Sequence, residues 1–129
     1  MAAVSTEQHF IDLKEPASLE RELSAAKAEG QWVLVDYYAD WCVSCKVMEK
    51  TVFANPEIQA SLQDVRVLRP DVTENNAASR ALLSRFEVLG PPTLLWIGPD
   101  GEERRSQRIT GAVDAKHFLQ IWTTTQERG

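Results

Sequence analysis

The chain has 129 residues, the size of a single domain that can bury a core without support from metals or disulfides. Hydrophobic residues make up 43% of the chain and charged residues 26%, which excludes a disordered protein, and the apolar runs are too short to cross a bilayer. The net charge of −5, with no basic cluster beyond Arg104, Arg105 and Arg108, argues against nucleic-acid binding. Residues 1–8 lack the pattern of a secretion signal, and we expect them to form a loose tail on one soluble domain spanning residues 1–129.

Strand and helix patterns alternate along the chain. Residues 32–39 are almost continuously apolar and rich in β-branched and aromatic side chains, which predicts a central strand covered on both faces. The other elements predicted ahead of Gly90-Pro91-Pro92 are a strand at 9–13, helices at 16–30, 43–54 and 56–62, a strand at 65–72 and a helix at 76–86. This alternation is typical of an α/β protein with helices packed on a sheet.

The last third of the chain predicts a hairpin and a final helix. Pro99-Asp100-Gly101 is a turn of the kind that joins antiparallel strands, so residues 104–110 are expected to fold back beside a strand at 93–97. Beyond Gly111 we expect an amphipathic helix whose apolar stripe is formed by Ala115, Phe118, Leu119 and Trp122. The order βαβαβαββα, with a mixed sheet flanked by helices, is that of the thioredoxin fold, whereas a doubly wound nucleotide-binding domain would keep its strands parallel.

The two cysteines, Cys42 and Cys45, lie where the predicted central strand ends and the next helix begins. A helix start offers free N–H groups and the positive end of the helix dipole, which favour a thiolate at Cys42. Cys45 lies one turn further along the same face, close enough to form a disulfide. The pattern predicts a redox-active dithiol that needs no other cofactor.

Two blander interpretations of the cysteines are less favoured. The first is a static disulfide or a pair of buried free thiols. It is less favoured because a disulfide that closes so short a loop adds little stability. A zinc site is the other, but closed zinc sites need four ligands, and the two histidines, His9 and His117, stand apart at no recognisable spacing. We therefore expect no metal.

Two acidic residues and a tryptophan flank the dithiol in the sequence. Asp36 interrupts the apolar strand six residues before Cys42, and burial there should raise the pKa of its carboxyl group toward neutral pH. Glu49 stands four residues after Cys45 and is expected on the cysteine face of the helix. Either these acids tune the dithiol, or Asp36 is satisfied at the strand end and Glu49 is a solvated helix residue. Trp41 directly precedes Cys42 and is expected to shield the thiol or to contact a partner.

The residues around the cysteines resemble a known family. The resemblance is carried by Tyr38-Ala39-Asp40-Trp41-Cys42-Val43-Ser44-Cys45-Lys46, by Asp36 and Glu49 on either side, and by Gly90-Pro91-Pro92-Thr93. This set is similar to the C-terminal periplasmic domain of the transmembrane disulfide reductases of the DsbD family. The resemblance implies that Cys42 attacks, that Cys45 resolves, and that Asp36 and Glu49 tune Cys42. It also implies that Pro92 is a cis-proline facing the dithiol, and we expect a cis bond between Pro91 and Pro92.

The resemblance further implies partners and a location. In that family the domain takes electrons from the membrane-embedded part of the same protein and passes them to the N-terminal periplasmic domain. We therefore expect a periplasmic, monomeric protein-disulfide reductase, linked to cytochrome c biogenesis. Its expected partners are protein thiols and disulfides, including the transmembrane and N-terminal domains of its own full-length protein, and no nucleic acid. Two alternatives stay open: a free-standing thioredoxin-like reductase with broad substrates, and a non-redox binding module on the same fold.

Overall fold

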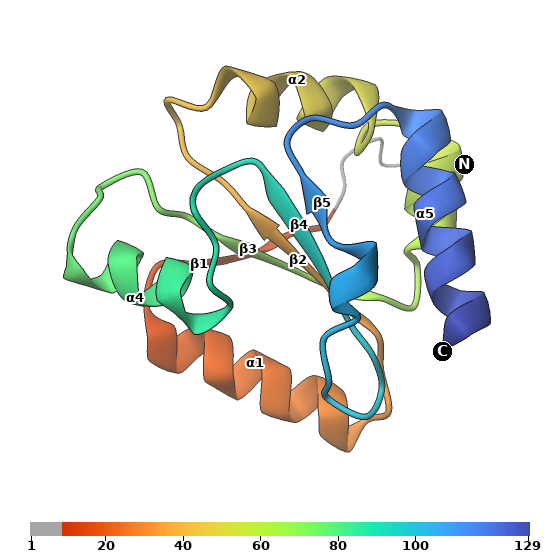
Figure 1. Cartoon of the computed structure of the whole chain (residues 1–129), viewed down its shortest axis with the longest axis horizontal. Helices are drawn as coiled ribbons and strands as arrows, with labels where there is room; N and C mark the ends of the chain where they lie inside the picture. Colours follow the sequence, from red (N-terminus) through yellow and green to blue (C-terminus); the bar gives the residue numbers. More distant parts are fainter. Residues whose placement is uncertain (1–8) are drawn as a thin grey trace, which may run out of the picture.

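A computed structural model describes residues 9–129 as a mixed sheet between two layers of helices (Figure 1). The tail expected at residues 1–8 lies outside the described residues. The strands are β1 (Ile11–Leu13), β2 (Val33–Tyr37), β3 (Arg66–Pro70), β4 (Thr93–Ile97) and β5 (Ile109–Thr110). The helices are α1 (Pro16–Ala28), α2 (Val43–Thr51), α3 (Pro56–Ser61), α4 (Ala77–Arg85) and α5 (Ala115–Arg128), with a 3-10 turn, η1, at Arg105–Gln107.

The sheet has the strand order β1-β3-β2-β4-β5. Strands β1, β3 and β2 run parallel, while β4 is antiparallel to β2 and β5 is antiparallel to β4. The apolar strand β2 lies at the centre of the sheet and every one of its residues is buried, as its sequence predicts. The predicted element order and the antiparallel C-terminal hairpin are therefore confirmed.

Side chains from alternate positions of the strands contribute to two hydrophobic clusters, one on each face of the sheet. Val35 of β2 packs with residues of α1 and α4 on one face, and Leu34 packs with residues of α2, α3 and α5 on the other. In the view of Figure 1, α1 lies below the sheet and α4 at its lower left, while α2 lies above the sheet and α5 to its right. The second cluster is rich in aromatic rings, among which Trp96 stacks on Trp122 with a centroid distance of 4.5 Å.

Short polar side chains fix the start of three helices. Asn55, Asn76 and Asp114 each accept hydrogen bonds from backbone N–H groups in the first turn of α3, α4 and α5, respectively. Helix α2 begins differently, with a cysteine in the N-cap position. Among residues 9–129, no helix is long and apolar enough to cross a membrane.

The predicted strand at 104–110 is wrong in its extent. Only Ile109 and Thr110 pair with β4 as a strand, and Arg105–Gln107 form the turn η1. The arginines that flank this turn bind nearby acidic side chains. The Arg104 guanidinium bonds Asp100, and that of Arg108 bonds Glu103. Backbone hydrogen bonds within the segment, from the Gln107 N–H to the Arg104 carbonyl and from the Arg108 N–H to the Arg105 carbonyl, close the turn in place of strand pairing with β4.

Candidate active site

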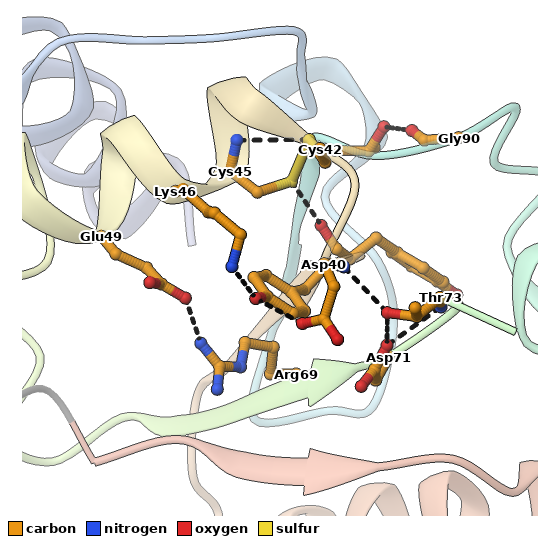
Figure 2. The surroundings of a disulfide bond; sticks show 12 residues. Asp40, Cys42, Cys45, Lys46, Glu49, Arg69, Asp71, Thr73 and Gly90 are labelled. Carbon is orange, nitrogen blue, oxygen red and sulfur yellow. Dashed lines mark hydrogen bonds and ion pairs between the residues drawn. A yellow bond between two sulfur atoms is a disulfide. The ribbon is translucent and has the colours of Figure 1, made fainter.

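A disulfide joins Cys42 to Cys45 at the start of α2, with the two Cα atoms 5.3 Å apart. Cys42 is the N-cap residue, and its sulfur accepts a hydrogen bond of 3.2 Å from the Cys45 N–H group. The second sulfur lies 3.9 Å from the carbonyl oxygen of Tyr37, the last residue of β2 (Figure 2). The Cys42 sulfur therefore takes the place of the capping oxygen at a helix start, where backbone N–H groups and the helix dipole favour negative charge.

Both sulfur-bearing residues are nearly covered. Cys42 is 6% exposed and Cys45 is 4% exposed. The position of Cys42 at an open helix end predicts that Cys42 is clearly more exposed than Cys45, and the two exposed fractions are instead nearly equal. In the disulfide form both cysteines belong to the same hydrophobic cluster as Ala39 and Val88, which accounts for their similar burial.

Large apolar side chains lie exposed on the segments that carry and flank the dithiol. Trp41 is 60% exposed, so it is not a core residue. Val43 and Val47 on α2 are also exposed, and Leu89, just before Gly90-Pro91-Pro92, is completely exposed. Exposed apolar groups gathered around a reactive group are typical of a surface that binds another molecule. The sequence analysis did not predict Leu89 as part of the site. The feature that could have identified it is its position directly before Gly90-Pro91-Pro92.

Hydrogen bonds to the loop after β3 hold Trp41 in place. The Trp41 indole N–H donates to the Thr73 carbonyl oxygen at 3.1 Å, and the Asp40 N–H donates to the Thr73 hydroxyl at 2.8 Å. The Thr73 hydroxyl in turn donates to Asp71 (Figure 2). The loop in front of Cys42 is thus tied to a segment more than 30 residues away, a contact that no local sequence pattern reveals.

The peptide bond between Pro91 and Pro92 is cis, which confirms that prediction. The next residue, Thr93, begins β4 and pairs with Tyr37 at the end of β2. The two prolines therefore enter the sheet at the same end at which β2 leads into Cys42. Neither proline has a backbone N–H group, so this segment can only accept hydrogen bonds through its carbonyl groups.

Asp36 lies on β2 and is 5% exposed. Burial raises the pKa of its carboxyl group to about 8, and although the positive charge of Arg69 lowers the pKa, the charges of Glu49 and Asp12 raise it further. No hydrogen bond from another described residue reaches this carboxyl group. The predicted direction of the pKa shift is confirmed, and Asp36 is largely protonated at neutral pH.

Glu49 lies on α2 and is bound to a basic residue that the sequence interpretation missed. Its carboxylate accepts a hydrogen bond of 2.7 Å from Arg69 on β3. Figure 2 shows this carboxylate directed at Arg69 and not at the disulfide. Glu49 is therefore neither a freely solvated helix residue nor in direct contact with the sulfur atoms.

Tyr38 connects the two sides of the site. Its hydroxyl donates to Asp40 at 2.8 Å and accepts from the Lys46 ammonium group at 2.9 Å. The Arg69 guanidinium carbon lies 4.5 Å from the centroid of the Tyr38 ring. Lys46, the residue after Cys45, is thus held by the Tyr38 hydroxyl.

Metal ligation finds no support in the part of the chain that the structure describes. No group of three or more histidine, cysteine or acidic side chains in residues 9–129 is placed to hold an ion. His117 bonds Asp114 at the start of α5, on a different element from the dithiol.

A disulfide that joins a helix N-cap to the first turn, at the end of the central strand of this fold, defines a thiol-disulfide oxidoreductase.

Comparisons with known proteins agree with that class. A thioredoxin-like family model matches residues 15–99. The chain is 63% identical to the thiol:disulfide interchange protein DsbD 2 of Pseudomonas aeruginosa over 97% of its length, and 62% identical to DsbD of Pseudomonas fluorescens over the same share. It spans 21% of the length of each of these relatives.

A solved structure covers the domain itself. The oxidised C-terminal domain of DsbD from Neisseria meningitidis is 30% identical, with a TM-score of 0.76; the match covers 87% of this chain and 97% of that one. The chain belongs to the thioredoxin-like family and, within it, to the C-terminal domains of the DsbD proteins.

Proposed function

We propose that this domain is an electron relay that reduces disulfides in partner proteins through Cys42 and Cys45. The observation that carries the proposal is the hydrogen bond from the Cys45 N–H group to the Cys42 sulfur at the start of α2. A helix N-terminus stabilises a Cys42 thiolate far more than a thiolate one turn further in, so Cys42 is the better attacking group.

The reaction is two successive exchanges. The Cys42 thiolate attacks one sulfur of the partner disulfide, forming a mixed disulfide and releasing the other partner sulfur as a thiolate. Cys45 then loses its proton and attacks the Cys42 sulfur, which frees the second partner sulfur. Two electrons and two protons pass to the partner, and the Cys42–Cys45 disulfide is left for an upstream donor to reduce.

Asp36 and Glu49 are proposed to tune the attacking sulfur. Negative charge near a thiol raises its pKa, which opposes the effect of the helix start. A higher pKa leaves less Cys42 thiolate at rest and so slows exchange with disulfides that do not dock. The buried, unbonded Asp36 carboxyl group supports this role, because it can gain or lose its charge close to neutral pH.

Trp41, Pro91 and Pro92 are proposed to form the surface that a partner contacts. Their exposed neighbours, Leu89 above all, extend this surface with apolar area that water leaves on docking. Tryptophan is enriched at protein interfaces, and the anchored Trp41 loses little side-chain freedom on binding.

The proposed setting is the periplasm, where the domain would take electrons from a membrane domain and pass them to an N-terminal domain of the same protein. The share of the DsbD relatives that the chain spans, about a fifth, supports this proposal, since it leaves room in those proteins for further domains. A trapped partner isolated from the native host tests it: peptides of an N-terminal domain of the same protein are expected in the mixed disulfide.

The activity itself is tested with cysteine variants. The reduced domain should reduce insulin, a protein disulfide substrate. Cys45→Ser should accumulate a mixed disulfide with it, while Cys42→Ser should accumulate none. Alkylation of the reduced parent with limiting iodoacetamide should label Cys42 first. Preferential labelling of Cys45 contradicts the assignment of roles, and a reduced parent that leaves insulin intact favours the non-redox binding module.

A further inference from the structure

Arg69 connects three elements of the domain beside the dithiol. From β3, its guanidinium group donates a hydrogen bond of 2.6 Å to Asp12 of β1. It donates another of 2.7 Å to Glu49 of α2 (Figure 2). It also stacks between two aromatic rings, 4.3 Å from the centroid of Phe10 and 4.5 Å from that of Tyr38. With two carboxylates and two rings around it, the group has one defined position, and the Arg69 side chain is only 18% exposed.

The groups that face Arg69 are mostly acidic. Burial alone would lower the pKa of the Arg69 guanidinium, but the hydrogen bond and charge of Asp12 and the charge of Glu49 raise it, so Arg69 stays a cation. The titratable groups that face it, or that reach it through Tyr38, are Asp12 on β1, Asp36 on β2, Tyr38 and Asp40 after β2, and Lys46 and Glu49 on α2. Arg69 is the cation that bonds acidic groups in this set directly, since Lys46 bonds the Tyr38 hydroxyl.

We propose that Arg69 is a positioning residue for the dithiol: it holds the Glu49 carboxylate against β3 and offsets the negative charge that Glu49 brings toward Cys42. This inference rests on the proposed function, because it assumes that the charge of Glu49 acts on Cys42. Without Arg69, the Glu49 side chain is free to leave β3 and its charge loses its nearest opposite charge. The Cys42 thiolate is then disfavoured, so Arg69 sets how reactive the resting dithiol is.

The strand that carries Arg69 also provides a matched control. Arg66, three residues earlier on β3, is 17% exposed and is likewise bound by two carboxylates, those of Glu22 and Glu29. Its partners lie on or next to α1, on the opposite face of the sheet from α2. Loss of Arg66 should therefore cost the domain comparable ion pairs without altering the charges near Cys42.

The test measures the rate of Cys42 alkylation by iodoacetamide as a function of pH in the reduced chain, using a Cys45→Ser background to isolate one thiol. Arg69→Gln should move the midpoint to higher pH and slow alkylation at pH 7 about three- to tenfold, since each pKa unit is a tenfold change in thiolate. Arg66→Gln should stay within about twofold of the parent, as expected for a residue far from the charges that act on the thiol. Adding Glu49→Gln to Arg69→Gln should restore most of the lost rate, because the released charge is then absent.

Each outcome decides a separate point. A profile for Arg69→Gln that matches the parent overturns the proposal, and so does an equal slowing in Arg66→Gln, which would show a general effect of destabilisation. If Arg69→Gln does not fold, Arg69→Lys replaces it. A single ammonium group cannot reproduce the separate hydrogen bonds that the guanidinium makes to Asp12 and to Glu49, so a smaller shift of the profile in the same direction is expected. An unshifted profile overturns the proposal. Asp36→Asn and Glu49→Gln in the same series test the proposed tuning itself. If neither moves the profile, the tuning role fails; if both move it and Arg69→Gln does not, only the role of Arg69 fails.

Discussion

The two arginines of β3 form similar ion-pair clusters on opposite faces of the sheet. Arg66 binds Glu22 at 2.8 Å and Glu29 at 2.6 Å, and its third partner is the neutral side chain of Gln31. Arg69 binds two carboxylates at nearly the same distances, and the two arginine side chains are almost equally covered. The residue type, the strand, the number of acidic partners and the burial therefore match.

The clusters differ in what lies next to them. Beside Arg69 is Asp36, a buried carboxyl group to which no described residue donates a hydrogen bond, and beyond it the disulfide of α2. The Arg66 cluster has no such neighbour among the described residues, and its acids lie on or next to α1. The geometry of an ion pair alone therefore does not assign it a structural or a functional role. The role depends on whether a buried, ionisable group lies within reach of its field.

The largest expected effect comes from removing the buried acid. In the unfolded chain Asp36 loses its proton near pH 3.8, and in the folded chain near pH 8. Between these values the folded state binds more protons, so stability falls as pH rises and the loss is complete above about pH 8. Asp36→Asn, which cannot ionise, should match the parent near pH 4 and exceed it above pH 8 by up to roughly 6 kcal/mol, at about 1.4 kcal/mol per pKa unit.

Chemical denaturation of the oxidised chain at pH 4, 6 and 9 measures this difference. Measurements on the oxidised form keep the thiols from titrating, and the difference between variant and parent at each pH isolates the contribution of Asp36. Equal pH slopes for Asp36→Asn and the parent would mean that Asp36 is ionised in the folded protein throughout, and the contrast between the two arginine clusters would lose its basis.

The second prediction compares the arginines directly. Arg66→Gln and Arg69→Gln should each cost about 2 kcal/mol at pH 5, because each leaves carboxylates without their charged hydrogen-bond donor. At pH 9 the cost of Arg69→Gln should grow, since Arg69 is the described cation whose charge lowers the pKa of Asp36, and the variant lacks that charge when Asp36 ionises. The cost of Arg66→Gln should stay the same. Unfolding curves of both variants at the two pH values decide this, and an equal increase in both would contradict a special role for Arg69.

Much of the fold could be predicted because its signals are local. The apolar run of β2, the proline pair before β4 and the turn at Pro99-Asp100-Gly101 each constrain the backbone within a few residues, and the structure agrees with all three. The strand expected at residues 104–110 was wrong in its extent, because the backbone at Arg105–Gln107 closes a turn through its own hydrogen bonds and the flanking Arg104 and Arg108 bond Asp100 and Glu103. Strand periodicity does not register such contacts.

In the candidate site, too, local features could be predicted from the sequence and contacts between distant segments could not. The cysteines and the buried Asp36 could be predicted, since a helix start and an acid within an apolar strand are visible in the sequence. Arg69 could not, because its two acidic partners are 57 and 20 residues away along the chain. The burial of Cys42 was also missed, because it depends on the packing of segments that meet only in the folded protein. Contacts between distant elements decide which charges surround the dithiol, and these are the part that sequence patterns leave open.

The smallest expected effect distinguishes two neighbouring tyrosines at the end of β2. The Tyr37 hydroxyl donates to the Leu82 carbonyl of α4, and burial raises the pKa of Tyr37 well above its usual range, so it keeps its proton. Tyr37→Phe leaves a buried carbonyl without this donor and should cost about 1 kcal/mol, equally at pH 5 and pH 9.

Tyr38→Phe instead removes the hydroxyl that links Lys46 to Asp40 by hydrogen bonds, on the side of the dithiol. Lys46 and Asp40 lie at the surface, where water can replace the lost hydroxyl, so the cost should be at most about 0.5 kcal/mol. The phenylalanine ring keeps the stacking contact with Arg69, and the position of Arg69 should therefore survive. If Arg69 governs Cys42 through its ion pair, Tyr38→Phe should leave the alkylation profile of Cys42 within about twofold of the parent, because the charges bound to Arg69 are unchanged. A shift as large as that of Arg69→Gln would assign the control to the Lys46–Tyr38–Asp40 chain, and the Arg69 cluster would then differ from the Arg66 cluster in position alone.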